Sequence, residues 1–90
     1  MIYSLDFLRA ACVKAAFQTN RQWLAVDPKG DIYLYDHKPT LTSTGWKEKH
    51  IGDEVEWFSR YKGKEHYANT LRELNKYRRK VDRIPVEASS

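Results

Sequence analysis

The stretch Trp23–Tyr35, WLAVDPKGDIYLY, decides the fold. Its centre, DPKG, has the residues of a tight turn. Asp27 can accept hydrogen bonds from the backbone ahead of it, the proline after it fixes φ, and Gly30 tolerates a positive φ. Apolar runs lie on both sides of this turn. The pattern therefore predicts a β-hairpin with a three-residue loop, between strands at about 22–27 and 31–36.

The loop length sets the register of the hairpin and divides its side chains between two faces, because directly opposed residues share a face. The expected pairs are Val26–Ile32, Ala25–Tyr33, Leu24–Leu34 and Trp23–Tyr35. One face is then aliphatic and suits a core. The other, here called the aromatic face, carries Trp23, Ala25, Tyr33 and Tyr35. Either a helix covers each face, or the aromatic face is a partly exposed platform for a partner.

Length and composition place the chain among small globular proteins. Its 90 residues predict one α+β domain over 1–84 and a flexible tail over 85–90. A hydrophobic content of 41% with 13% aromatic residues excludes wholesale disorder. The net charge of +4 allows an anionic partner without requiring one.

The single cysteine and the absence of long apolar runs indicate the cellular compartment of the protein. Cys12 cannot form an internal disulfide, which favours a reducing, cytoplasmic environment. Its alanine neighbours indicate a buried structural thiol rather than a nucleophile. No stretch approaches the length of a membrane span, and the N-terminus lacks the basic region of a signal peptide. We therefore expect no membrane contact.

Two elements beside the hairpin complete the expected sheet layer. A helix is predicted over about 4–19, with a buried stripe of Leu5, Leu8, Ala11, Cys12, Ala15 and Ala16. These small side chains predict a close approach to the sheet. After a polar loop at 36–45, a third strand is predicted at about 46–51, where three successive charged residues suit a sheet edge.

The segment 53–62 allows two interpretations. A Gly-Asp turn at Gly52 could lead into a fourth strand. Alternatively, Asp53 and Glu56 form a capping box, and Gly63 ends a short helix. The helix is favoured because acidic residues lie at its start and Lys62 at its end.

A longer helix is predicted over about 65–82. Its buried stripe consists of Tyr67, Leu71, Leu74, Tyr77 and Val81. A basic row recurs on the opposite side, at Arg72, Lys76, Arg79 and Arg83. The expected fold is thus α+β, with an N-terminal helix, a three-stranded antiparallel sheet, and a short and a longer C-terminal helix.

Residues for catalysis or metal binding do not cluster in the sequence. His37, His50 and His66 lie in different predicted elements without metal-ligand spacing. Asp27 and Asp31 are accounted for by the turn, and no glycine-rich phosphate loop is present. We therefore expect a non-enzymatic protein without a metal or cofactor.

One local pattern resembles small bacteriophage-encoded proteins of unassigned function. It comprises WLAVD at 23–27, GDIYLY at 30–35, Lys38-Pro39 and Trp46. The resemblance implies a phage or mobile-element origin, and it carries over no site residues.

Two functional hypotheses follow. In the first, the protein binds a host protein in the bacterial cytoplasm and modulates or inhibits it, through Trp23, Tyr33, Tyr35 and Trp46 together with basic residues. In the second, Arg72, Lys76, Arg79 and Arg83 contact the phosphates of DNA or RNA. The α-β-β-β-α order is also that of double-stranded-RNA-binding domains, although the basic cluster of those domains is diluted here. The sequence leaves open whether the chain forms a homodimer.

Overall fold

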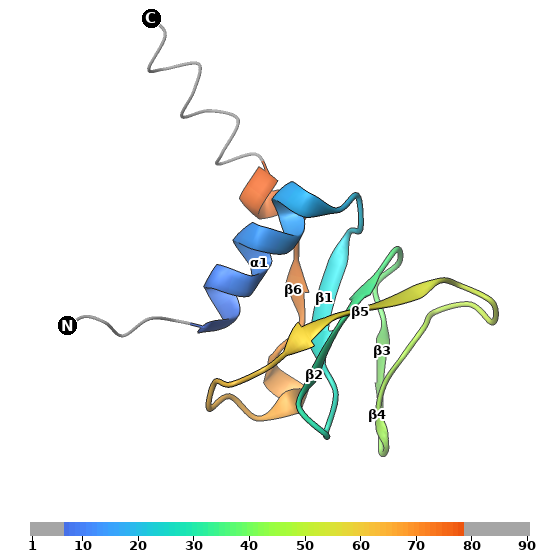
Figure 1. Cartoon of the computed structure of the whole chain (residues 1–90). Coiled ribbons are helices and arrows are strands. Elements are labelled where there is room, and N and C mark those ends of the chain that lie inside the picture. The colour runs from blue at the N-terminus through green and yellow to red at the C-terminus, as the bar shows by residue number, and fades with distance from the viewer. Residues whose placement is uncertain (1–6, 79–90) are drawn as a thin grey trace, which may run out of the picture.

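A computed structural model describes residues 7–78 of the chain. One helix lies on one side of an antiparallel sheet, and a small hairpin lies on the other side (Figure 1). The elements are α1 (Phe7–Gln18), β1 (Trp23–Val26), β2 (Asp31–Tyr35), β3 (Thr40–Thr42), β4 (Gly45–Lys47), β5 (Val55–Arg60), the 3-10 helix η1 (Tyr67–Asn69) and β6 (Arg72–Glu73). Residues 75–78 are helical. The predicted α+β class with an N-terminal helix is confirmed.

The main sheet has four strands in the order β5-β2-β1-β6, and β3 pairs with β4 in a separate two-stranded sheet. The prediction of a single three-stranded sheet is therefore wrong. Its expected third strand, 46–51, corresponds to β4, which ends at Lys47 and does not join the main sheet. Its partner β3 lies in the segment predicted to be a polar loop.

The β1–β2 hairpin forms with the predicted register, including all four residue pairs. The Gly30 N–H donates to the Asp27 carbonyl at 2.9 Å, and Gly30 has a φ of 92°. One carboxylate oxygen of Asp27 accepts hydrogen bonds from the backbone N–H groups of Lys29 and Asp31, at 3.0 and 2.9 Å. The turn is thus held by the glycine and the aspartate that predicted it.

The core lies between α1 and the aliphatic face of the hairpin. Leu24, Val26, Ile32 and Leu34 are all buried, as are the predicted α1 positions Leu8, Ala11, Cys12, Ala15 and Ala16. The alanines bring the helix close to the sheet, and Cys12 is fully buried as expected. Leu74 from the C-terminal part of the chain completes this cluster.

Segment 53–62 contains β5, so the favoured helix is wrong and the alternative of a strand is correct. This strand pairs with β2 and does not form a hairpin with the strand before Gly52. Two of the acidic residues that suggested a helix start, Glu54 and Glu56, bind one arginine instead. The Arg21 guanidinium, which follows α1, contacts Asp36 at 2.8 Å, Glu54 at 3.0 Å and Glu56 at 3.1 Å. These carboxylates hold the pKa of Arg21 well above its usual range. Arg21 therefore attaches the first half of β5 to the linker between α1 and β1.

The single helix predicted over 65–82 is also wrong across its first half. Tyr67–Asn69 is a 3-10 turn and Arg72–Glu73 pairs with β1, so helical structure begins only at residue 75. Thr70 is buried between them: its hydroxyl donates to the Tyr67 carbonyl at 2.7 Å and accepts from the Val26 N–H at 2.9 Å. Of the predicted buried stripe, Leu74 is buried, and Val81 lies outside the described residues.

Arg78 links the helical turn at 75–78 to the end of α1. Its guanidinium donates to the Ala16 carbonyl at 3.0 Å, the Thr19 carbonyl at 2.8 Å and the Asn75 side chain at 2.8 Å. Carbonyl groups at a helix C-terminus have no partner within the helix and carry partial negative charge. Arg78 is therefore a C-terminal cap of α1 supplied by a distant part of the chain.

We expect Arg78→Met to lower the free energy of unfolding by about 1–2 kcal/mol, because charged hydrogen bonds to these carbonyls are lost. Urea unfolding followed by circular dichroism measures the change. Lys76→Met is the matched control, since the exposed Lys76 loses the same charge from the same turn. Equal effects of the two substitutions would contradict the capping role.

Candidate functional site: the aromatic face and its pocket

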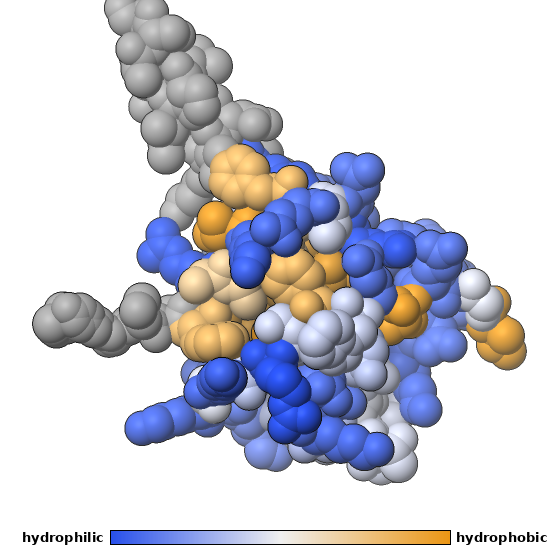
Figure 2. All heavy atoms as spheres, in the orientation of Figure 1, coloured by the Kyte–Doolittle hydropathy of each residue, from blue (hydrophilic) through white to orange (hydrophobic). Residues whose placement is uncertain are grey.

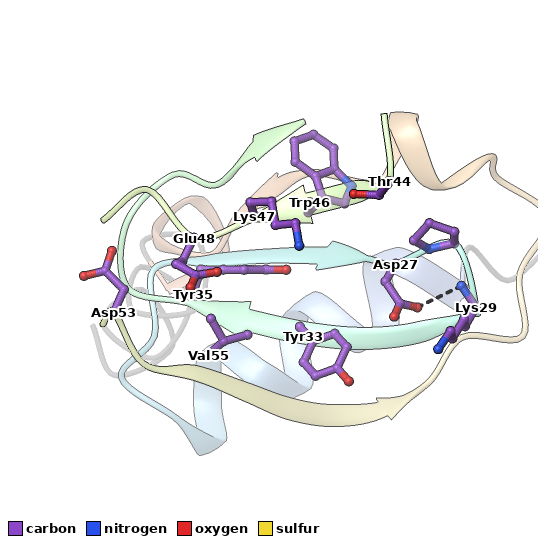
Figure 3. Close-up of a pocket in the computed structure, with 11 residues that line it drawn as sticks. Asp27, Lys29, Tyr33, Tyr35, Thr44, Trp46, Lys47, Glu48, Asp53 and Val55 are labelled. Atoms are coloured by element: carbon purple, nitrogen blue, oxygen red, sulfur yellow. Dashed lines mark hydrogen bonds between the residues drawn. The ribbon is translucent and has the colours of Figure 1, made fainter. Parts of the chain in front are cut away.

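The β3–β4 hairpin, rather than a helix, covers part of the aromatic face. A pocket of about 560 Å³ lies between them (Figure 3). Its lining consists of Asp27, Pro28, Lys29, Tyr33, Tyr35, Thr44, Trp46, Lys47, Glu48, Asp53 and Val55. Three of the four aromatic residues predicted from sequence, Tyr33, Tyr35 and Trp46, are thus brought together at one pocket.

The β3–β4 hairpin contacts η1 at one point and the β1–β2 turn at another. The Trp46 indole N–H donates to the Tyr67 carbonyl at 3.0 Å. Gly45 is buried with a φ of +125°, and a Cβ atom there would lie 2.8 Å from the Pro28 ring. Any larger residue would push the hairpin away from the β1–β2 turn, so Gly45 is needed for the pocket to form.

Tyr35 forms the most buried wall of the pocket. The residue is 4% exposed. Burial, with the negative charges of Asp27 and Glu48, raises the pKa of Tyr35 to about 12. Its phenol is therefore neutral at physiological pH, and the nearby carboxylates make the electrostatic potential around it negative.

Strand β5 extends the aromatic face beyond the residues predicted from sequence. Val55 pairs with Tyr35, and Trp57 pairs with Tyr33, so all four lie on one face. Val55 is 38% exposed and Trp57 is 54% exposed. The β3–β4 hairpin thus covers the Tyr35 side of the face and leaves the β5 side open.

The carboxylate of Asp31 contacts two side chains of β5 on the open side of the aromatic face. Asp31 Oδ1 accepts a hydrogen bond from the Trp57 indole N–H at 3.2 Å and lies 3.5 Å from a guanidinium nitrogen of Arg60. Tyr33 lies beside Trp57 on the neighbouring strand. We call these four residues, Asp31, Tyr33, Trp57 and Arg60, the Trp57 cluster. This cluster was not predicted from sequence, because the favoured helix over 53–62 places Trp57 elsewhere.

Trp23, the fourth aromatic residue predicted from sequence, does not line the pocket. It is half-buried, and the ammonium group of Lys38 lies 5.8 Å from the centroid of its ring. In the register of the sheet it stands between Glu73 and Tyr35. The cation–π contact and the two neighbouring strands explain the position of Trp23 without an external binding partner.

The predicted basic row is not a feature of one helix. Arg72 lies on β6, where its guanidinium donates to the carbonyls of Asn69 and Leu71 at 2.9 and 3.0 Å. Lys76 lies in the helical turn, and Arg79 and Arg83 lie outside the described residues. Arg72 and Lys76 therefore do not share the helical spacing from which they were predicted to act together.

Two of the three histidines lie close together, although they were predicted in different elements. His37 and His50 come from different loops, yet their ring centroids are 5.4 Å apart. Asp53 contacts His37 Nδ1 at 3.2 Å and accepts from the His50 backbone N–H at 3.1 Å. Over residues 7–78, no group of three or more His, Cys, Asp or Glu side chains is placed to hold a metal ion.

The fold and site describe a small α+β protein with a partly covered aromatic sheet face. Comparisons with protein-family models, with curated proteins and with solved structures found no match for the chain. In the part of the chain that the structure describes, no helix has the length and apolar character needed to cross a membrane.

Proposed function

We propose that this chain is a small, non-enzymatic binding protein, encoded by a phage or mobile element, that modulates or inhibits a host protein. The binding surface is the open side of the aromatic face, centred on the Trp57 cluster. The observation that carries the proposal is the large exposed fraction of Trp57, 54%, in a side chain fixed by a hydrogen bond to Asp31.

The residue types of the cluster are those that contribute most to protein interfaces, namely tryptophan, tyrosine and arginine. Asp31 holds Trp57 and Arg60 in place before any partner arrives. This preorganisation reduces the conformational entropy lost on binding. The adjacent pocket, of about 560 Å³, can accept a side chain of the partner.

Charge indicates the kind of partner. Lys29 and Lys47 line the pocket and form no ion pair with the described residues, and Arg60 stands 64% exposed at the cluster. By contrast, the carboxylate of Asp27 binds backbone N–H groups. Glu48 and Asp53 also line the pocket, so the surface carries charges of both signs. It therefore favours a partner segment that combines an apolar anchor with polar and charged side chains.

Affinity capture from a bacterial host lysate, with and without nuclease, tests the proposal. The captured protein is then titrated against the chain and its variants. Trp57→Ala is expected to weaken binding at least tenfold. Phe17→Ala is the matched control, because Phe17 is also an exposed aromatic residue but lies on α1.

Asp31→Ala tests the preorganisation separately. It keeps Trp57 and Arg60 but removes the carboxylate that positions both, so affinity should fall although the contact residues remain. Unchanged affinity of Trp57→Ala would refute the proposed surface. Loss of all capture after nuclease treatment would instead support the nucleic-acid alternative, for which binding to an oligonucleotide must weaken steeply with salt.

A further inference from the structure

Another pocket, of about 530 Å³, lies at the loop between β5 and η1. Two of its lining residues, Phe7 and Tyr61, pack against the core on the α1 side of the sheet, and their ring centroids are 5.7 Å apart in an edge-to-face contact. We call it the loop pocket. It is separate from the Trp57 cluster, which lies on the aromatic face.

Tyr61 fixes the loop that forms this pocket. Its backbone N–H donates to the Gly30 carbonyl at 2.7 Å, and its hydroxyl accepts from the Glu65 backbone N–H at 3.0 Å. Gly63 lies so close to the Tyr61 ring that a Cβ atom at this position would overlap the ring. The loop therefore folds back over Tyr61 and holds residues 62–64 at the pocket.

The side chains that this loop presents are mainly hydrogen-bond donors. Lys62 and Lys64 line the pocket, are exposed, and form no ion pair with the other described residues. His66 Nδ1 accepts from the Ala68 backbone N–H at 3.1 Å, so the neutral ring carries its proton on Nε2 and donates there. Among the described lining residues, Glu65 alone is acidic. The lining thus has an excess of positive charge at neutral pH.

An anion is the class of ligand that complements these groups. Figure 2 shows hydrophilic residues gathered at the lower end of the molecule, where Figure 1 places this loop and the β1–β2 turn. The oxygens of a phosphate group can accept from two ammonium groups and an imidazole N–H at the same time, and hydrogen bonds between ionised groups are the strong ones. Phosphate is therefore the anion that the donors of the loop pocket favour.

The size of the pocket and its aromatic residues indicate a ligand larger than phosphate alone. Its volume falls within the range of small-molecule sites. One face of the His66 ring packs on Tyr67, with centroids 4.5 Å apart, which leaves the other face for a ligand. We propose that the loop pocket binds a phosphate ester such as a nucleotide, with the phosphate on Lys62, Lys64 and His66 Nε2 and the organic part against the aromatic rings.

Titration of the full, isotope-labelled chain with adenosine monophosphate, followed by NMR of the backbone amides, tests the proposal. Amide shifts are expected over residues 62–66, and affinity should fall as salt is added. Lys62→Gln and Lys64→Gln should each weaken binding about tenfold, because each removes a charged hydrogen bond. Glu65→Gln should strengthen binding, because it removes the carboxylate that repels the phosphate. Gly63→Ala keeps every charge but displaces the loop, so it should also weaken binding.

Lys76→Gln is the matched control, because it removes an exposed lysine from the helical turn at 75–78, at the opposite end of α1 from the loop pocket. Weakening by Lys76→Gln equal to that by Lys62→Gln would show that binding follows net charge alone, and would overturn the proposal. So would the absence of shifts over residues 62–66 at millimolar ligand. Trp57→Ala should leave this binding unchanged, which keeps the test independent of the proposed protein-binding surface.

Three further ligands identify the source of the phosphate. Adenosine lacks the phosphate and should not bind. Inorganic phosphate lacks the organic part and should bind more weakly than adenosine monophosphate, and equal affinity would contradict an ester. A single-stranded oligothymidylate that binds more tightly at the same amides assigns the ester to a nucleic acid, whereas tighter binding of the mononucleotide assigns it to a free nucleotide.

Discussion

Thr70→Val is expected to lower the free energy of unfolding by about 2–3 kcal/mol, although it keeps the size and shape of the side chain. Thr70 is fully buried, and its hydroxyl is the partner of the Val26 N–H. When the β1–β6 register is continued, residue 70 stands opposite residue 26, two positions beyond the last strand pair. The Thr70 hydroxyl thus accepts the hydrogen bond from β1 at a position that precedes strand β6. Valine would leave the buried Val26 N–H without a partner.

Urea unfolding measures this loss, and hydrogen exchange at the Val26 amide locates it. Thr70→Ser is the control, because it keeps the hydroxyl and removes only a methyl group, at a cost of about 1 kcal/mol. Faster exchange of the Val26 amide is expected in Thr70→Val but not in Thr70→Ser. Equal stability of the two variants would show that the hydroxyl contributes nothing.

The second large effect concerns stability at alkaline pH. The pKa of Tyr35 rises from 10.0 to about 12 in the folded protein, chiefly because the phenol is buried. Below pH 10 the phenol is protonated in both states, and its contribution to stability is complete. Between pH 10 and 12 the unfolded chain loses this proton while the folded chain retains it. Stability is therefore lost across this window, by on the order of 2–3 kcal/mol.

Comparing wild type with Tyr35→Phe at a series of pH values isolates this contribution. The variant keeps the buried ring but cannot ionise, so its stability should fall less between pH 10 and 12. Burial raises the pKa of Tyr77 in the same direction, and that contribution remains in both proteins. Stability curves that stay parallel above pH 10 would contradict the assignment to Tyr35.

Local chemistry explains which elements could be predicted from sequence. The β1–β2 register follows from four consecutive turn residues, and α1 follows from a stripe of small apolar side chains. β5 could not be predicted in this way, because its acidic residues suited a helix start equally well. Their actual partner is Arg21, which lies 33 and 35 residues away from Glu54 and Glu56. A two-residue strand such as β6, paired with the distant β1, leaves no periodic pattern at all.

The candidate site also contains residues that could be predicted from local sequence patterns and residues that could not. Tyr33 and Tyr35 belong to the hairpin, and their shared face follows from its register. Trp46 was predicted as a site residue, but its position depends on a bond to the Tyr67 carbonyl, which no local pattern reveals. Trp57 was missed because its face depends on whether 53–62 is a strand or a helix. The covered half of the aromatic face was therefore predictable, and the open half was not.

The position of β6 in the sheet has a consequence for synthesis on the ribosome. Strand β1 lies between β2 and β6, and the fully buried Leu74 comes directly after β6. The core therefore lacks one strand and one of its leucines until residue 74 has left the exit tunnel. Because nascent chains emerge from the N-terminus, β1 waits for its second neighbouring strand until β6 has been synthesised. Truncation before residue 72 would remove β6 and leave β1 with an exposed edge.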